Sequence, residues 1–155
     1  MSQTFVLERT QIIPTDIRTC WEFFSAPENL DTITPADLHF SIITDLKKRK
    51  MSDDMIIDYK VSPFKGLKIL WRSKIVEVIE HVRFTDIQLK GPFNNWIHTH
   101  TFSETGNSIK MTDRVEYELP FDLPGSLIHL LFVKSRLEYI FDYRYSRIES
   151  IFRML

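Results

Sequence analysis

The chain has 155 residues, of which 43% are hydrophobic and 26% charged, and this composition excludes a disordered or low-complexity segment. Its 20 Lys and Arg balance 21 Asp and Glu, so the formal net charge of -1 provides no field to attract nucleic acid or an anionic bilayer. One cysteine excludes an intramolecular disulfide, and the sequence has neither a signal-peptide pattern nor an apolar run that could cross a membrane. We expect one domain over residues 1–155, in the cytoplasm, without nucleic-acid binding or stable membrane insertion.

The N-terminal segment predicts a strand followed by two short helices. Thr4–Ile13 is rich in β-branched and aromatic side chains, which favour a strand. Thr15 or Asp16 can cap a first helix. Its apolar residues recur at helical spacing: Ile17, Cys20, Trp21 and Phe24. Ser25–Glu28 has the spacing of a capping box, which predicts a second short helix to about Ile33.

The middle of the chain predicts extended structure. No helical period is present from Asp37 to Leu119, and turn residues separate the apolar stretches. Six strands are predicted: His39–Leu46, Met55–Val61, Leu67–Val78, Val82–Leu89, Trp96–Ser103 and Ser108–Leu119. Because the loops between them are short, the strands should form an antiparallel meander.

The C-terminal segment predicts one long amphipathic helix. It follows Pro124–Gly125, and Ser126–Phe152 contains neither proline nor glycine. One stripe holds its apolar residues: Leu130, Val133, Leu137, Ile140, Phe141, Ile148 and Phe152. A curved sheet of seven strands can bury its concave face only against this helix, so we expect an α+β fold in which the sheet wraps around the helix. Such an arrangement often encloses a cavity.

The hairpin near Thr105–Gly106 places several polar residues on the inner face. A loop centred there pairs residues whose numbers sum to 211, so that Trp96 faces Val115 and His98 faces Asp113. Since side chains alternate along a strand, one face holds Trp96, His98, His100, Phe102, Met111, Asp113, Val115 and Tyr117.

The preceding strand can extend this polar group. If Lys90 pairs with Trp96, Gln88 lies beside His98 and Asp86 lies beside His100. Ile87 and Leu89 compete with these polar residues for the inner face of the same strand.

Three interpretations of these polar residues remain open. A His98–Asp113 couple can fix the strand register inside the core. The same groups can line a pocket and orient the polar end of a ligand. They can also act in acid–base catalysis, with His98 as the base and Asp113 as the group that orients it. The pattern contains no nucleophile, because Cys20 is expected to be a small core residue of the first helix.

A metal site is a further alternative. His98, His100 and Glu104 form the pattern H-x-H-x-x-x-E, which is part of the cupin metal signature. The flanking residues depart from it, since Gly91 is one residue too far from His98 and Met111 stands where glycine is expected. We therefore expect no metal and no cofactor.

The whole chain resembles the START/SRPBCC superfamily, the helix-grip fold of polyketide cyclase-like and lipid-transfer proteins, and in particular uncharacterised bacterial members. Three groups of residues carry the resemblance: Phe23–Leu30 with Ile33–Pro35; Gly91–Phe93 with Trp96, His98, His100, Phe102, Asp113, Val115 and Tyr117; and Phe141–Arg144. The resemblance implies a curved seven-stranded antiparallel sheet around a long C-terminal helix, with two short helices after the first strand. The superfamily includes binders, transfer proteins, cyclases and hydratases.

The expected function is binding of a small hydrophobic molecule, for transport or sequestration, between sheet and helix. The helical stripe also contains Arg144, which can hold a ligand carboxylate. The expected ligand-binding residues are Trp71, Phe84, Trp96, His98, His100, Phe102, Met111, Asp113, Tyr117, Leu137, Phe141 and Arg144. One alternative is a cyclase, dehydratase or hydratase that uses His98 with Asp113. The other is a protein with a filled core that either docks a partner protein through its sheet edge or long helix, or forms a homodimer through the apolar start of that helix.

Overall fold

A computed structural model describes residues 3–120 and 126–154. The described residues form two α-helices, two 3-10 helices (η) and seven strands. In chain order these are β1 (Thr4–Ile13), α1 (Ile17–Phe24), η1 (Pro27–Ile33), η2 (Ala36–Leu38), β2 (Ser41–Ile42), β3 (Ile56–Phe64), β4 (Leu67–Ile79), β5 (Arg83–Lys90), β6 (Asn95–Thr105), β7 (Ser108–Glu118) and α2 (Ser126–Arg153). The predicted α+β class and element order are confirmed. The Pro124–Gly125 break that predicted the start of α2 lies outside the described residues.

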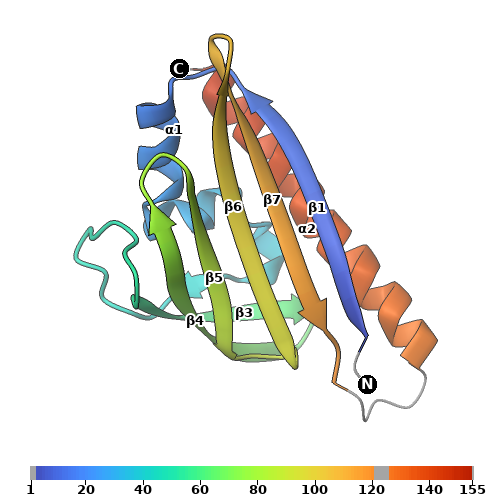
Figure 1. Ribbon diagram of the computed structural model, residues 1–155. Helices are drawn as coiled ribbons and strands as arrows, with labels where there is room; N and C mark the ends of the chain where they lie inside the picture. Colours follow the sequence, from blue (N-terminus) through green and yellow to red (C-terminus); the bar gives the residue numbers. More distant parts are fainter. Residues whose placement is uncertain (1–2, 121–125, 155) are drawn as a thin grey trace.

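The seven strands form one antiparallel sheet in the order β1-β7-β6-β5-β4-β3-β2. The sheet curls strongly toward β3 and β4, and α2 lies behind it, across its concave face (Figure 1). Register shifts interrupt the pairing of β3 with β4 and of β4 with β5. Bulges of this kind bend a strand and increase its twist, which lets a meander wrap around a helix.

The helices and the second strand differ in detail from the prediction. Asp16 caps α1 by accepting a hydrogen bond from the Thr19 backbone N–H at 2.9 Å, as the sequence indicated. The second short helix is a 3-10 helix that begins with Pro27. The strand predicted for His39–Leu46 shortens to Ser41–Ile42, because His39 adopts a left-handed conformation (φ 46°) that ends η2 and is incompatible with extended backbone.

The β6–β7 hairpin has the predicted faces with a register shifted by two residues. Thr105 pairs with Ser108, so the turn is centred on Gly106–Asn107 rather than on Thr105–Gly106. Gly106 provides the positive φ (57°) at the first turn position, where a side chain would be strained. As a consequence His98 pairs with Val115, not with Asp113, and the predicted Trp96–Val115 pairing is also wrong.

The β5–β6 pairing requires the same correction. Asp86 pairs with His98, so the predicted positions of Asp86 beside His100 and Gln88 beside His98 are wrong. Gln88 instead bonds both backbone groups of Phe93 and so holds the β5–β6 loop. The competing Leu89 is exposed, on the face of β5 opposite Asp86 and Gln88.

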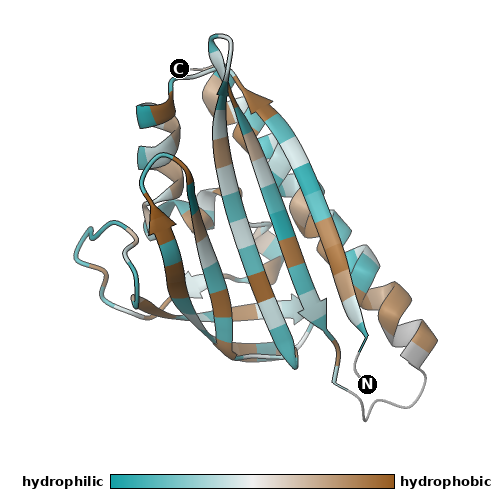
Figure 2. Ribbon diagram, viewed as in Figure 1, coloured by the Kyte–Doolittle hydropathy of each residue, from teal (hydrophilic) through white to brown (hydrophobic). Residues whose placement is uncertain are grey.

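A shift of two residues preserves the face of every side chain, since the alternation has a period of two. All eight residues predicted to point inward from β6 and β7 are buried. Figure 2 shows hydrophilic as well as hydrophobic bands along both strands, because the buried face includes two histidines and an aspartate.

Two hydrophobic clusters fill the space between sheet and helices. The first packs α1 against the hairpin end of the sheet and includes Trp21, Phe24 and Phe102. The second packs α2 against the middle of the sheet and includes Trp96, Leu137 and Phe141. The polar residues of the inner face lie between these clusters.

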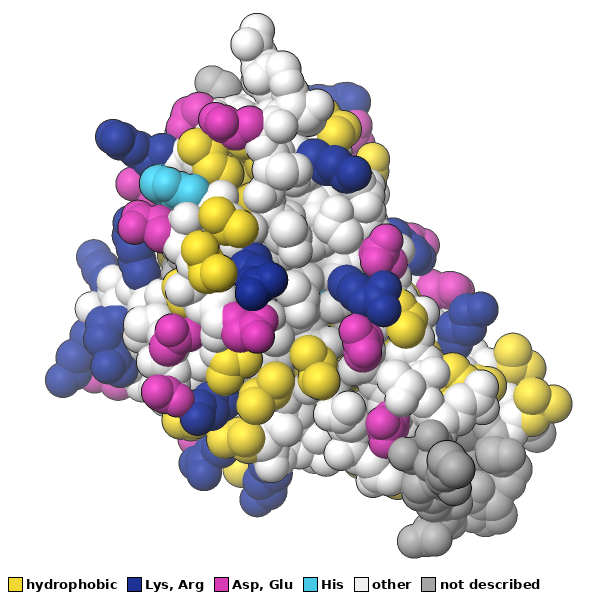
Figure 3. Space-filling model, in the orientation of Figure 1, with side chains coloured by type: hydrophobic (Ala, Val, Ile, Leu, Met, Phe, Trp, Pro, Cys, Tyr) yellow, Lys and Arg dark blue, Asp and Glu magenta, His cyan; other side chains and the backbone are white. Residues whose placement is uncertain are grey.

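The outer surface carries charges of both signs. Figure 3 shows basic and acidic side chains interspersed on the face formed by the strands. Among the described residues, no helix is both long and apolar enough to pass through a lipid bilayer.

Phe102 should be essential to the first cluster. Its ring lies within 5.7 Å of the rings of Trp21 and Phe24, measured between centroids. We expect Phe102→Ala to lower the free energy of unfolding by about 3–5 kcal/mol, measured by urea denaturation, because it leaves a cavity in a packed core. Val6→Ala on the exposed face of β1 is the control and should cost less than about 1 kcal/mol. Equal losses for the two variants would contradict this description of the core.

Candidate functional site

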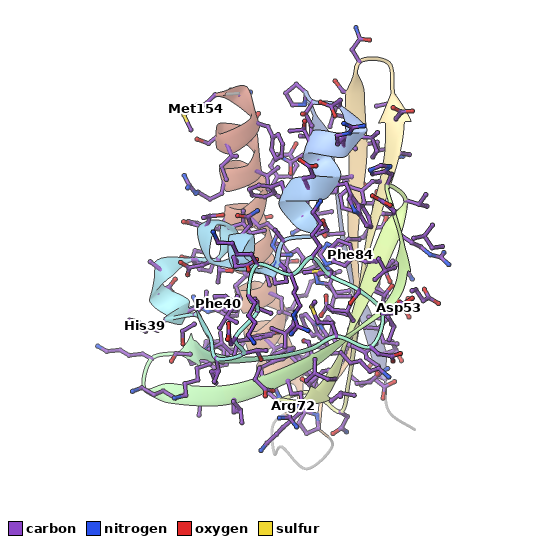
Figure 4. The ribbon with its side chains drawn as sticks, turned by 90° about the vertical axis from the view of Figure 1, so that its left-hand side faces the viewer. His39, Phe40, Asp53, Arg72, Phe84 and Met154 are labelled. Atoms are coloured by element: carbon purple, nitrogen blue, oxygen red, sulfur yellow. The ribbon has the colours of Figure 1, made fainter. Side chains whose placement is uncertain are left out.

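A cavity of about 240 Å³ lies between the concave face of the sheet and α2. Residues from the 3-10 helices, from β3 to β6 and from α2 line it. In Figure 4, Phe84 of β5 lies between the sheet and the helices. Arg72 of the neighbouring strand β4 instead points outward, from the convex face of the sheet. Strand alternation therefore determines which residues reach the cavity.

Most of the cavity wall is apolar. Trp71, Trp96 and Phe93 pack edge to face or tilted, with ring centroids 4.8–5.8 Å apart. Leu137 and Phe141 of α2 close the opposite side. Hydrophobic side chains of both 3-10 helices, including Leu30 and Leu38, complete the wall. Such a wall favours an apolar ligand and excludes a strongly hydrated one.

Two histidines and two aspartates form a buried cluster at the polar end of the cavity. Asp113 Oδ1 lies 3.2 Å from His98 Nε2 and 2.7 Å from His100 Nδ1. The second distance is an ionic contact, because the angle does not satisfy a regular hydrogen bond at His100 Nδ1. Asp86 Oδ2 lies 3.4 Å from His98 Nδ1 and 3.5 Å from His100 Nε2. Both imidazoles thus lie between two carboxylates.

The surroundings of the cluster shift the pKa values of the two histidines in opposite directions. Burial lowers the pKa of His98, and the nearby His100 lowers it further, so His98 is held neutral. Burial also acts to lower the pKa of His100, but Asp113 and Asp86 outweigh it and raise this pKa above the usual value. Although burial opposes ionisation of Asp113, the two histidines hold its pKa well below the usual range. The two carboxylates therefore favour the protonated form of His100, whereas burial favours the neutral form of His98.

Arg144 of α2 reaches the same end of the cavity. Its Nε and Nη1 atoms are buried and have no hydrogen-bond partner among the described residues. The guanidinium carbon lies 4.8 Å from the centroid of the Phe141 ring, which provides a cation–π contact but accepts no conventional hydrogen bond. Buried guanidinium N–H groups without acceptors are costly, so this position favours an anionic partner.

Uncharged polar groups of Tyr59, Trp71 and Ser73 also lie at the polar end of the cavity. Ser73 Oγ accepts a hydrogen bond from Trp71 Nε1 at 3.1 Å and lies 3.2 Å from the Tyr59 hydroxyl. Burial and the charge of Asp86 raise the pKa of Tyr59, so its hydroxyl stays protonated and can donate. The sequence analysis did not single out Tyr59 or Ser73. A signal for Ser73 was the alternation on β4, where Trp71, Ser73 and Ile75 are all buried.

The structure brings most of the expected ligand-binding residues to the cavity. Trp71, Phe84, Trp96, Leu137 and Phe141 form part of its apolar wall, and His98, His100 and Arg144 part of its polar end. Four others pack behind this surface: Phe102, Met111, Asp113 and Tyr117.

Two residues named in the sequence analysis take other positions. Cys20 is fully buried, and burial raises the pKa of its thiol to about 12, so it offers no thiolate nucleophile. Glu104 lies exposed at the tip of the β6–β7 hairpin, where it pairs with Ile109.

No protein-family model matches the sequence, and no curated protein matches it. Solved structures match nearly the whole chain. A major latex-like protein from Panax ginseng has a TM-score of 0.68 at 16% identity, over 96% of this chain and 97% of that one. A START superfamily protein from Mycobacterium smegmatis has a TM-score of 0.59 at 13% identity, over 94% and 98%.

A longer protein contains the same fold. A nucleoside-diphosphate sugar epimerase from Corynebacterium glutamicum matches 93% of this chain with 28% of its own length, at 22% identity and a TM-score of 0.63. At these identities the three comparisons establish the helix-grip fold that the sequence predicted.

Asp113 should stabilise the fold through the charge that it places beside both imidazoles. We expect Asp113→Asn to lower the free energy of unfolding by about 3 kcal/mol in urea denaturation, because removing one partner of a buried ion pair leaves the other charge uncompensated. Asp142→Asn breaks the exposed pair between Asp142 and Arg9, which are 3.1 Å apart, and should cost less than about 1 kcal/mol. A negligible loss for Asp113→Asn would mean that the cluster contributes little to stability.

Proposed function

We propose that this protein binds a small, mostly hydrophobic molecule that carries one acidic group, in the cavity between the sheet and α2. The observation that carries the proposal concerns Arg144, which lines an apolar cavity and whose buried Nε and Nη1 atoms have no hydrogen-bond partner among the described residues. A ligand carboxylate would supply the missing acceptors in a water-poor setting, where a charge-assisted pair is strongest. The aromatic wall would bury the rest of the ligand.

The size of the cavity limits the ligand. Its volume of about 240 Å³ exceeds that of the apolar cavity of about 150 Å³ that accommodates benzene. It lies at the lower end of pockets that hold drug-sized molecules, which start at about 300 Å³. A molecule of roughly ten non-hydrogen atoms is therefore favoured, such as a medium-chain or aromatic carboxylic acid.

Acid–base catalysis on the bound molecule is the second candidate. His98 lines the cavity and is neutral at physiological pH, while Asp113 contacts its Nε2 atom at 3.2 Å. A neutral imidazole that a carboxylate orients can accept a proton, as a hydratase or dehydratase requires. Both nitrogens of His98 lie against carboxylates, however, so a substrate would have to displace Asp86 from Nδ1. Binding without turnover therefore remains the first proposal.

Arg144→Gln should weaken binding of acids selectively. We expect octanoate and cinnamate to bind about 10- to 100-fold more weakly to this variant, because hydrogen bonds to a charged group contribute about 1.5–3 kcal/mol. The affinity for the corresponding methyl esters should stay unchanged. Intrinsic fluorescence can report binding, since Trp71 and Trp96 line the cavity.

The control is Arg153→Gln, which removes an exposed guanidinium from the end of the same helix. It should leave the affinities for acids and esters unchanged. Tighter binding of the esters than of the acids by the wild-type protein would contradict the role of Arg144. So would equal losses of acid affinity in the two arginine variants.

A further inference from the structure

Three electron-pair donors converge at the polar end of the cavity. Asp86 Oδ2 lies 3.4 Å from His98 Nδ1 and 3.5 Å from His100 Nε2. One donor atom of each residue lies within 4.8 Å of the donor atoms of the other two. Two ligand atoms bound tetrahedrally to zinc, at about 2.0–2.1 Å, stand about 3.3 Å apart. The two Asp86 distances therefore match this coordination geometry.

The opposite nitrogens of both imidazoles meet a different carboxylate. Asp113 Oδ1 is close to His98 Nε2 and to His100 Nδ1. In metal sites the ring nitrogen that does not bind the metal is usually held by a carboxylate or carbonyl, which fixes the tautomer and makes the ligand more basic. With the ring protons on the Asp113 side, both imidazoles present lone pairs toward Asp86.

The three donor atoms of Asp86, His98 and His100 favour a positive charge between them. Two imidazole lone pairs and a carboxylate repel one another when they are buried together. A divalent cation would interact favourably with all three donor atoms at once.

We propose that Asp86, His98 and His100 bind a divalent first-row transition metal ion through Oδ2, Nδ1 and Nε2. Two histidines and one carboxylate form a ligand set that suits Zn²⁺ or Fe²⁺ and leaves coordination positions open. All three residues line the cavity whereas Asp113 packs behind them, so the open positions face the cavity.

The third ligand differs from the one in the cupin-like pattern of the sequence. That pattern used Glu104, which lies at the exposed hairpin tip. Asp86 of the adjacent strand occupies the required place, since β5 pairs Asp86 directly with His98. The site goes beyond the proposed function, because it concerns binding of an ion with or without an acidic ligand.

Cobalt(II) is a direct probe, because its visible absorption bands report coordination geometry. Chelator-treated protein is titrated with CoCl₂ and followed by absorption and calorimetry. The wild-type protein should bind one equivalent with the intense bands of a four- or five-coordinate site. His98→Gln and Asp86→Asn should each weaken binding by at least about tenfold, since each removes a ligand. Far-UV circular dichroism and the melting temperature establish that the variants are folded.

His81→Asn is the matched control. His81 is a half-exposed imidazole whose one ionic contact among the described residues is the exposed Glu80, and asparagine tolerates its positive φ of 64°. This variant should bind cobalt as the wild-type protein does. No uptake of cobalt by the wild-type protein would overturn the proposal, and so would an equal loss of affinity in His81→Asn.

A measurement on the unmodified chain removes any dependence on variant folding. Phe84 stacks on His100 at 4.3 Å between ring centroids, and the ring of Phe141 lies 5.4 Å from that of His98. Cobalt at the proposed position should shift and broaden the NMR signals of both phenylalanine rings at one equivalent. Paramagnetic effects confined to surface residues would overturn the proposal.

Discussion

The packing of α2 across the concave face of the sheet determines the rest of the structure. The sheet curls because bulges interrupt β3, β4 and β5, and the helix then closes the resulting concavity. Aromatic side chains fill most of the space, but they leave about 240 Å³ between Trp71, Trp96 and Phe141. A flatter sheet would pack directly against the helix and leave no such volume.

The same packing buries the polar cluster, and burying charged groups away from water costs free energy. Asp86, Asp113 and the two histidines come from three adjacent strands, and all face the interior. Charged groups in such a place are tolerated only when they compensate one another. His100 lies within 3.5 Å of both carboxylates, whereas two buried guanidinium atoms of Arg144, Nε and Nη1, have no hydrogen-bond partner among the described residues. The unmatched group, rather than the matched ones, is therefore the best indicator of what the cavity is built to accept.

The sequence predicted the architecture well because strand alternation and helical periodicity are strong signals. It placed His98, His100 and Asp113 on the inner face correctly even though the hairpin register was shifted by two residues, since such a shift keeps every residue on its face. The shift arose because Gly106 was taken as the second turn residue, whereas its positive φ makes it the first.

What the sequence could not provide was the partition between cavity and core. Phe84 and Phe102 are both aromatic and inward-facing, yet only the first borders the cavity. The difference depends on where the curled strands and α2 separate, a tertiary property that no local pattern encodes. Likewise, Asp86 reaches the histidines because β5 alternates regularly from Phe84, which pairs with His100, to Asp86, which pairs with His98. The sequence left the competition between the two sets of β5 residues open. The dimer expected from the apolar start of α2 stays a prediction.

Native mass spectrometry of protein purified without added ligand tests the central claim most directly. We expect a fraction of the protein to carry an extra mass of about 130–170 Da, as roughly ten non-hydrogen atoms require. This mass should disappear under denaturing conditions, and the released molecule should ionise as an acid. A bound molecule without an acidic group would contradict the account. The bare chain alone, even after incubation with millimolar octanoate and cinnamate, would contradict it as well.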